Sequence, residues 1–262
     1  MELKLNHTLE FILIISTFPA SELMTTINDN LRQALLPGKI LAVQVGLSRT
    51  AVVVETEDGI RCGLAATLSN PEFEHHCQSS VRHAGHLHEM DYTELAGLIE
   101  SPSFTEVSIG LATINALLPR NPNQWADLNA EDYLVQQGAN KNVAVVGHFP
   151  FINRLRPLVK NLWVLELKPR EGDLPAQAAP EFIPQADLVA ITATKLINKT
   201  FQGLIDLCRP DAKVVLIGPS APLSPTLYNY GIDILSGTIV TDPQAALSGV
   251  GQGISLYQLR QA

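Results

Sequence analysis

The sequence predicts an α/β protein in which a small α+β domain precedes a domain with a mostly parallel sheet. The first observation is the apolar run 143–146, stopped by Gly147, which is typical of a strand buried on both faces. The second is a helical stretch at 151–159 and a strand-like stretch at 162–167, which complete a βαβ unit. The third is a meander of strand-like runs in the first half, followed by helices and not alternating with them.

In the first half, the apolar stretch 9–15 is expected to form a strand or a helix turn packed on the first domain. An amphipathic helix follows at 21–36, where leucine or isoleucine recurs every four residues. Asp58-Gly59 is a hairpin signal between two strand-like runs. The expected strands and helices are 40–47, 50–55, 60–66, 91–100 and 107–118.

The segment 119–127, with proline and asparagine, is the expected linker, so the predicted domains are residues 1–120 and 121–262. After it come a capped helix at 129–137 and a proline-rich loop at 168–184. Pro243 after Asp242 marks the start of a last helix. The remaining strands are expected at 188–192, 213–217 and 232–235, with a helix at 198–208.

Composition limits the class of partner. The formal net charge is −8 and no lysine- or arginine-rich block occurs, which argues against nucleic acid or an anionic membrane. The apolar stretch 11–15 is too short to span a bilayer. Three sparse cysteines suit a reducing cytoplasm, and Cys62 and Cys208 are expected in the core. The expected partner is a small-molecule or metal ligand, with a homodimer left open.

Small and polar residues follow successive strands, and parallel strands place such loops on one edge of the sheet. Backbone amides and hydroxyls there can hold a phosphate, a carboxylate or a ribose, or the residues simply make turns. Glu166 stands about 20 residues after Gly147, where dinucleotide folds place an acid on the ribose, but the G-x-G-x-x-G fingerprint is absent. Ser-His-Asp spacing, a P-loop and HExxH are also absent, so no catalytic residue is assigned.

Several runs resemble the heavy-metal chelation domain family. They are Val-Gly-His-Phe-Pro (146–150), Leu-Glu-Leu-Lys-Pro (165–169), 186–200, 216–222 and 230–237, with 63–67 and 109–117 in the first half. The resemblance covers roughly residues 20–255. It implies an enolase-N-terminal-like domain joined to a Rossmann-like domain, a cleft between them, and a role in binding or making a chelator of heavy metals. One departure is Ala193, where the family pattern leads us to expect glycine.

Two functions remain open from these residues. In the first, the interdomain cleft binds a chelated metal or a chelator precursor. In the second, a transferase-type enzyme uses an S-adenosylmethionine-like cofactor, with Gly147 under the cofactor and Glu166 on its ribose. A third hypothesis is a scaffold subunit whose site is vestigial and binds neither ligand. The expected ligand-binding residues are Gly147, His148, Phe149, Pro150, Glu166, Thr192, Thr194, Asn198, Gly218, Pro219 and Ser220, with Thr67 and Asn115 from the first domain.

Histidines cluster between 75 and 88. His75, His76 and Cys77 are candidate ligands of zinc, copper or nickel, although their spacing matches no standard zinc module. The alternative is a solvated loop that is rich in histidine. His148 stands apart in the strand-end loop, where it serves as a ligand, a general acid or base, or a hydrogen bonder that fixes the turn.

Overall fold

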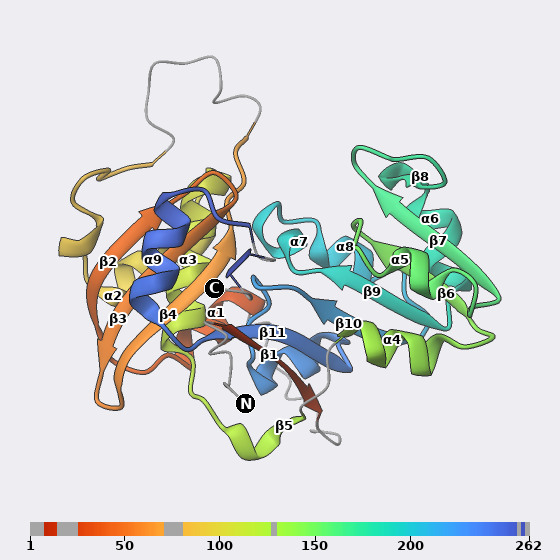
Figure 1. Cartoon of the computed structure of the whole chain (residues 1–262), viewed down its shortest axis with the longest axis horizontal. Coiled ribbons are helices and arrows are strands. Elements are labelled where there is room, and N and C mark those ends of the chain that lie inside the picture. Colours follow the sequence, from red (N-terminus) through yellow and green to blue (C-terminus); the bar gives the residue numbers. More distant parts are fainter. Residues whose placement is uncertain (1–7, 15–25, 71–80, 127–129, 256–257, 260–262) are drawn as a thin grey trace, which may run out of the picture.

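A computed structural model describes residues 8–14, 26–70, 81–126, 130–255 and 258–259. Figure 1 shows two sheets side by side. Among the described residues, the small sheet has three strands and the larger one has eight. The α/β class with a mostly parallel large sheet and a separate small sheet is confirmed. None of the described helices is long and apolar enough to cross a membrane.

The small sheet is an antiparallel meander, as the sequence predicts. Its strands are β2 (Lys39–Val45), β3 (Arg49–Thr56) and β4 (Gly59–Ala66). The tight turn between β3 and β4 consists of Glu57 and Asp58, and Gly59, paired with Thr56, begins β4 with a φ of 109°, which glycine adopts without strain. The predicted hairpin is present, with its turn one residue earlier than the Asp58-Gly59 pair.

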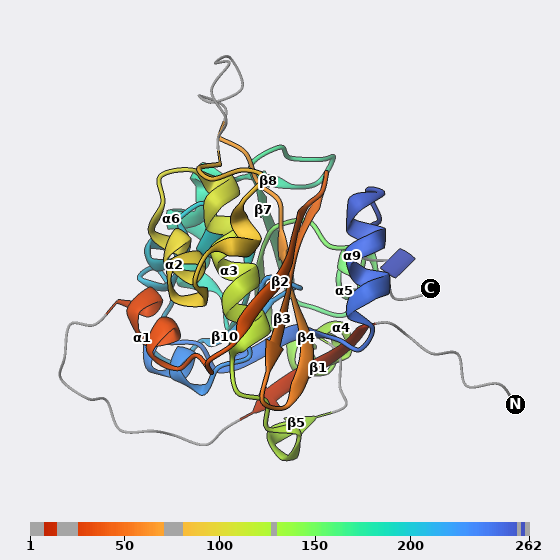
Figure 2. The same ribbon diagram turned by 90° about the vertical axis from the view of Figure 1, so that its left-hand side faces the viewer.

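Helices cover both faces of the small sheet (Figure 2). One face carries α3 (Phe104–Leu117), with α2 (Tyr92–Gly97) and the 3-10 helix η3 (Leu98–Glu100) beside it. The other face carries α9 (Pro243–Gly251). Residues of β3 alternate accordingly: Val52 and Val54 belong to the core under α3, and Val53 to the core under α9.

The large sheet has the strand order β5-β1-β11-β10-β9-β6-β7-β8. The six strands from β11 to β8 are parallel, whereas β1 is antiparallel to β11 and to β5. The bounds are β1 Thr8–Ile14, β5 Trp125–Ala126, β6 Asn142–Val146, β7 Asn161–Glu166, β8 Leu174–Pro175, β9 Leu188–Thr192, β10 Lys213–Ile217 and β11 Ile234–Val240.

Counted from β6, the parallel strands lie in the order 3-2-1-4-5-6, the order of doubly wound dinucleotide-binding sheets. The winding reverses between β6 and β9, which are hydrogen-bonded neighbours. Ligands of such sheets bind at this switch point, outside the carboxyl ends of the strands. The topology alone therefore indicates a ligand-binding position, at the carboxyl ends of β6 and β9.

The helices of this half are shorter than predicted. The helix expected at 151–159 is the single turn α5 (Ile152–Leu155), because Pro157 has no N–H to donate and so cannot continue the helical hydrogen bonds. Of the helix expected at 198–208, only the short α8 (Phe201–Ile205) forms, and the unpredicted turn α7 (Thr194–Ile197) precedes it, with Lys199 at a φ of 60° between them. The loop expected at 168–184 includes β8 and the turn α6 (Ala179–Phe182).

The remaining helices are α1 (Ile27–Gln33), α4 (Ala130–Gly138), η2 (Leu87–Glu89), η4 (Pro122–Gln124), η5 (Ala176–Ala178), η6 (Ile183–Gln185) and η7 (Pro225–Tyr230). The predicted caps near Ser21 and Asn129 lie outside the described residues. In α1 the described cap is Thr26, whose hydroxyl accepts a hydrogen bond from the Asp29 N–H at 3.1 Å.

Both ends of the described chain cross to the other half of the molecule. The expectation that 9–15 packs on the first domain is wrong, because β1 pairs along its whole length with β11 of the large sheet. Conversely, α9 follows the large sheet in sequence but packs on the small one. The expected linker contributes β5, which pairs with β1. The division at residue 120 stays a prediction.

Candidate functional site

The switch point of the large sheet is lined by Gly147 after β6 and Thr192 at the end of β9. Gly147 has a φ of 106°, and a Cβ added to it would lie 3.0 Å from the Thr192 Cγ2. The Thr192 and Thr194 hydroxyl oxygens are 3.1 Å apart. Ala193 between them has a φ of −64°, which any residue adopts, so this backbone does not need the glycine expected there. The predicted glycine turn and threonine pair therefore lie side by side.

Glu166 holds the turn after β6. One carboxylate oxygen accepts a hydrogen bond from the His148 N–H at 3.0 Å, and the other accepts from the Leu167 N–H at 2.7 Å. Glu166 ends β7, the neighbour of β6, so the contact joins two strand ends that the sequence had predicted to be adjacent. Glu166 thus positions the backbone of His148, whether or not Glu166 also contacts a ligand.

His148 forms a pair with Asp173, a residue that the sequence analysis missed. The distance from the His148 Nδ1 to the Asp173 carboxylate is 2.9 Å, and the side chains are 21% and 1% exposed. The same Asp173 oxygen accepts the Arg170 N–H at 3.0 Å, while the buried Oδ1 has no partner in the described chain. The acid lies in the loop after β7, and its position beyond a strand end is the signal that could have found it.

Electrostatics keep Asp173 ionised. Burial alone would raise the pKa of Asp173, but the hydrogen bonds from the Arg170 N–H and His148, with the charges of His148 and Arg156, outweigh burial. The net result is a pKa of Asp173 below its ordinary value. When the neutral His148 donates its Nδ1–H to this carboxylate, Nε2 is the nitrogen left to bind a metal.

Lys195, in α7 just beyond the switch point, is the second residue that the sequence analysis missed. It is only 6% exposed. Burial lowers the pKa of Lys195, and the nearby carboxylate of Glu166 partly opposes that shift. A buried lysine with a perturbed pKa is a marker of a functional position.

The first half of the chain reaches the same edge of the large sheet. The Ala66 N–H, at the end of β4, donates to the buried Ser220 hydroxyl oxygen after β10, at 2.8 Å. Thr67 follows immediately and shares a hydrogen bond of 2.9 Å with the Thr50 hydroxyl. Gly218, before Pro219 and Ser220, has a φ of 116° and open space where a Cβ would stand. The β10 loop is therefore in contact with the small sheet.

Asn115 lines a small cavity together with Ala221, the residue after Ser220. Its amide nitrogen donates to the Leu64 carbonyl oxygen at 2.8 Å, while its Oδ1 is buried without a partner. Arg120 and Thr238 also contribute unpartnered polar atoms to this cavity of about 10 Å³, which has room for one water molecule. Asn115 thus lies next to a strand carbonyl and a polar void.

Other predicted site residues make local contacts. The Asn198 Oδ1 accepts from the Thr200 hydroxyl at 2.7 Å and so closes the turn between α7 and α8. The Phe149 ring stacks on Phe151 with centroids 5.0 Å apart, and Pro150 is exposed. Whether these residues contact a ligand remains a prediction.

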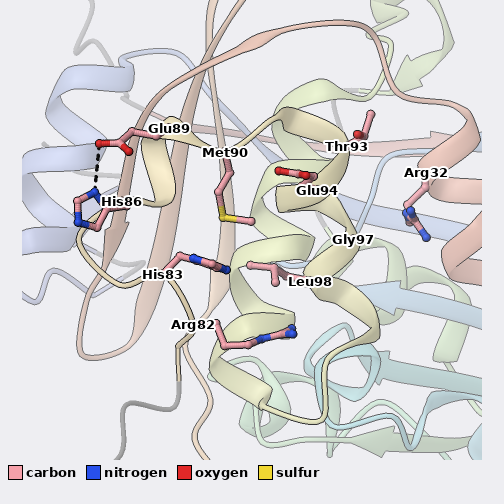
Figure 3. A pocket seen from close by; sticks show the side chains of 10 residues that line it. All are labelled: Arg32, Arg82, His83, His86, Glu89, Met90, Thr93, Glu94, Gly97 and Leu98. Carbon is pink, nitrogen blue, oxygen red and sulfur yellow. Dashed lines mark hydrogen bonds and ion pairs between the residues drawn. The ribbon is translucent and has the colours of Figure 1, made fainter.

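The metal-ligand candidates His75, His76 and Cys77 lie outside the described residues. Nearby, His83 and His86 line a cavity of about 680 Å³ between η2, α2 and α1 (Figure 3). The His86 Nδ1 pairs with Glu89 at 3.1 Å, whereas His83 extends away from that pair toward Leu98. Across the described ranges, no three His, Cys, Asp or Glu side chains form a group that could hold a metal ion.

Comparison with known proteins places the chain in a family. A family model described as "putative heavy-metal chelation" (DUF364) matches residues 129–262, just over half of the chain, and a second model with that description (DUF4213) matches 28–118. An uncharacterised protein of Methanocaldococcus jannaschii is 26% identical over 216 residues, which cover 80% of this chain and 82% of the relative.

Solved structures agree. A DUF364 protein of unknown function from Desulfitobacterium hafniense superposes with a TM-score of 0.75 at 29% identity, over 90% of this chain and 95% of that one. A DUF364 protein of unknown function from Pyrococcus horikoshii superposes with a TM-score of 0.75 at 22% identity, over 87% of this chain and 92% of that one. Because the identity is this low, the likeness supports the fold alone. With both halves matched in order, the chain belongs to the DUF364 family, whose description is "putative heavy-metal chelation".

Proposed function

We propose that the protein binds a small metal-chelating molecule, or its metal complex, at the switch point of the large sheet. The observation that carries the proposal is the His148–Asp173 pair, which lies beside Glu166 at the carboxyl ends of β6 and β7. The reducing cytoplasm is the proposed setting, since Cys62 and Cys208 are free thiols.

The His148–Asp173 pair has the chemistry of a metal ligand with its supporting carboxylate. Histidines that bind metals commonly donate the other ring N–H to a carboxylate, which fixes the tautomer and makes the free nitrogen more basic. Imidazole suits zinc, copper and nickel. His148 would supply one nitrogen donor, and the chelating molecule would supply the others.

The position of the pair supports a small organic ligand as well as a metal. It lies at the switch point, where doubly wound sheets bind ligands. The small sheet reaches this edge through the Ala66–Ser220 hydrogen bond, and so would close over a ligand bound there. Exclusion of water would strengthen each polar contact to a charged chelate.

The test uses the Ni²⁺ complex of nitrilotriacetate, which leaves coordination positions open for an imidazole. We expect calorimetry to detect one bound equivalent of this nickel complex in the wild type and none in His148→Ala. Asp173→Asn should weaken that equivalent by roughly ten- to a hundredfold, the usual effect of removing a supporting carboxylate. His88→Ala is the matched control, because His88 is 55% exposed and lies far from Asp173 in sequence. Equal loss in His148→Ala and His88→Ala would refute the proposal.

A transferase-type function with an S-adenosylmethionine-like cofactor is the second candidate. The strand order favours it, as does the place of Glu166 at the end of β7 beside the Gly147 turn. S-adenosylmethionine should then raise the melting temperature of the protein, since it binds only the folded state. Glu166→Gln should abolish that rise. If the nickel complex raises the melting temperature and S-adenosylmethionine does not, the metal chelate is the favoured ligand.

A further inference from the structure

We propose that a cavity of about 450 Å³ between α1 and the α7–α8 segment is a second ligand site, which takes a small organic acid with one negative charge and an apolar body. The cavity is formed by both halves of the chain. Ile27 and Glu100 line it from the first half, and Lys195, Lys199, Phe201 and Tyr230 line it from the second. Its volume lies within the usual range for small-molecule sites, about 300–1,000 Å³.

Lys195 is the residue that calls for an anion. The residue is only 6% exposed, and burial penalises its ammonium more than the charge of Glu166 stabilises it. A buried charge is costly unless it is paired. An anionic group in the cavity would provide a partner.

Lys199 places a second ammonium at the same cavity. Its Nζ donates to the Glu100 carbonyl oxygen at 3.2 Å, across the boundary between the two halves. Its backbone has a φ of 60°, which is uncommon outside glycine and is often found at functional positions. The turn that ends α7 is therefore held in a special conformation at the cavity.

The charges that line the cavity favour a monoanion. Lys195 and Lys199 are cationic and Glu100 is anionic, so one positive charge is left unbalanced. The apolar part of the wall is provided by Phe201, which is 3% exposed, together with Ile27 and Leu196. A carboxylate or sulfonate on an aromatic or aliphatic body matches this combination of groups.

The site is separate from the one proposed above. His148 and Asp173 do not line this cavity, and Glu166 acts on Lys195 only through its charge. The two proposals can therefore fail independently of each other.

The probe is 8-anilinonaphthalene-1-sulfonate, a fluorescent aromatic monoanion, titrated into the full chain. We expect Lys195→Met, which keeps the length of the side chain and removes its charge, to weaken binding by about ten- to a hundredfold. The matched control is Lys160→Met at an exposed lysine, which should bind like the wild type. Because burial penalises this ammonium more than Glu166 stabilises it, Lys195→Met should melt no lower than the wild type.

Two further measurements define the outcome. N-phenyl-1-naphthylamine has the same aromatic body without the sulfonate, and should bind the wild type at least about tenfold more weakly. His148→Ala should leave the sulfonate affinity unchanged, which separates this site from the metal-chelate site. Equal affinity of Lys195→Met and Lys160→Met, or equal binding of the neutral and sulfonated probes, would overturn the proposal.

Discussion

Asp173 links the stability of the protein to pH. Its pKa is lower in the folded protein than in the unfolded chain, because the Arg170 N–H and His148 favour the ionised form more than burial disfavours it. Such a group stabilises the fold above its unfolded pKa, about 3.9, and loses that contribution as the pH falls through the lower folded pKa.

Asp173→Asn should accordingly lower the free energy of unfolding at pH 7 by about 1.5–3 kcal/mol, the range for hydrogen bonds to a charged group. The deficit relative to the wild type should shrink as both proteins are brought to about pH 3 and below. Urea unfolding across this pH range measures it. Asp211→Asn, at a carboxylate that is 77% exposed, is the control and should change little. A deficit that is the same at every pH would count against this role of Asp173.

Single residues could be predicted from the sequence where the strand ends marked them. Gly147, His148, Glu166 and Thr192 were selected because they follow or end predicted strands, and the structure brings them together. Asp173 was missed because its burial depends on how the 168–184 loop folds back onto His148. Lys195 was missed because a lysine normally lies in water, and only the packing of α7 under α3 buries it.

At the scale of elements, the contact between β4 and α3 depends on Gly63. A Cβ added at Gly63 would lie 2.1 Å from the Ala112 carbonyl oxygen and 2.3 Å from the Ala116 nitrogen, both in the backbone of α3. Helix and strand backbones therefore approach more closely here than a side chain allows.

Gly63→Ala should reduce the free energy of unfolding by about 1–3 kcal/mol or more, because the helix backbone must move. Gly203→Ala is the control, since no atom lies within 4 Å of its Cβ position in α8, and alanine should be neutral or stabilising there. Thermal and urea unfolding of both variants would measure this difference in the free energy of unfolding. Similar stability of the two would mean that α3 does not pack tightly on β4.

Local chemistry determined which elements the sequence could predict. The β3–β4 hairpin and the start of α9 follow from Asp58-Gly59 and from the Asp242 cap, whose carboxylate accepts the Ala245 N–H at 2.9 Å. The helices α5 and α8 were predicted too long, because the apolar pattern continues past Pro157 and begins before the turn at Lys199, whereas the helical backbone does neither. The partner of β1 is more than 200 residues away and leaves no local signal.

For the whole molecule, limited proteolysis is expected to cut first between about residues 118 and 129, at the predicted linker. The two fragments should nevertheless remain together. The first fragment keeps β1 in the large sheet through seven paired positions with β11, and the second keeps α9 on the small sheet. We expect the nicked protein to elute from size exclusion as the intact chain does. Separation into two folded pieces without denaturant would contradict this arrangement.

The place of α9 also has a consequence for synthesis on the ribosome. The small sheet is complete in sequence at Ala66, but one of its faces, with Ala51, Val53 and Cys62, is covered by a helix that begins at Pro243. At the usual rate of about 5–20 residues per second, translation reaches that helix roughly 10–40 seconds later. During this interval the nascent chain presents an apolar sheet face that chaperones can bind, until α9 is made and covers it.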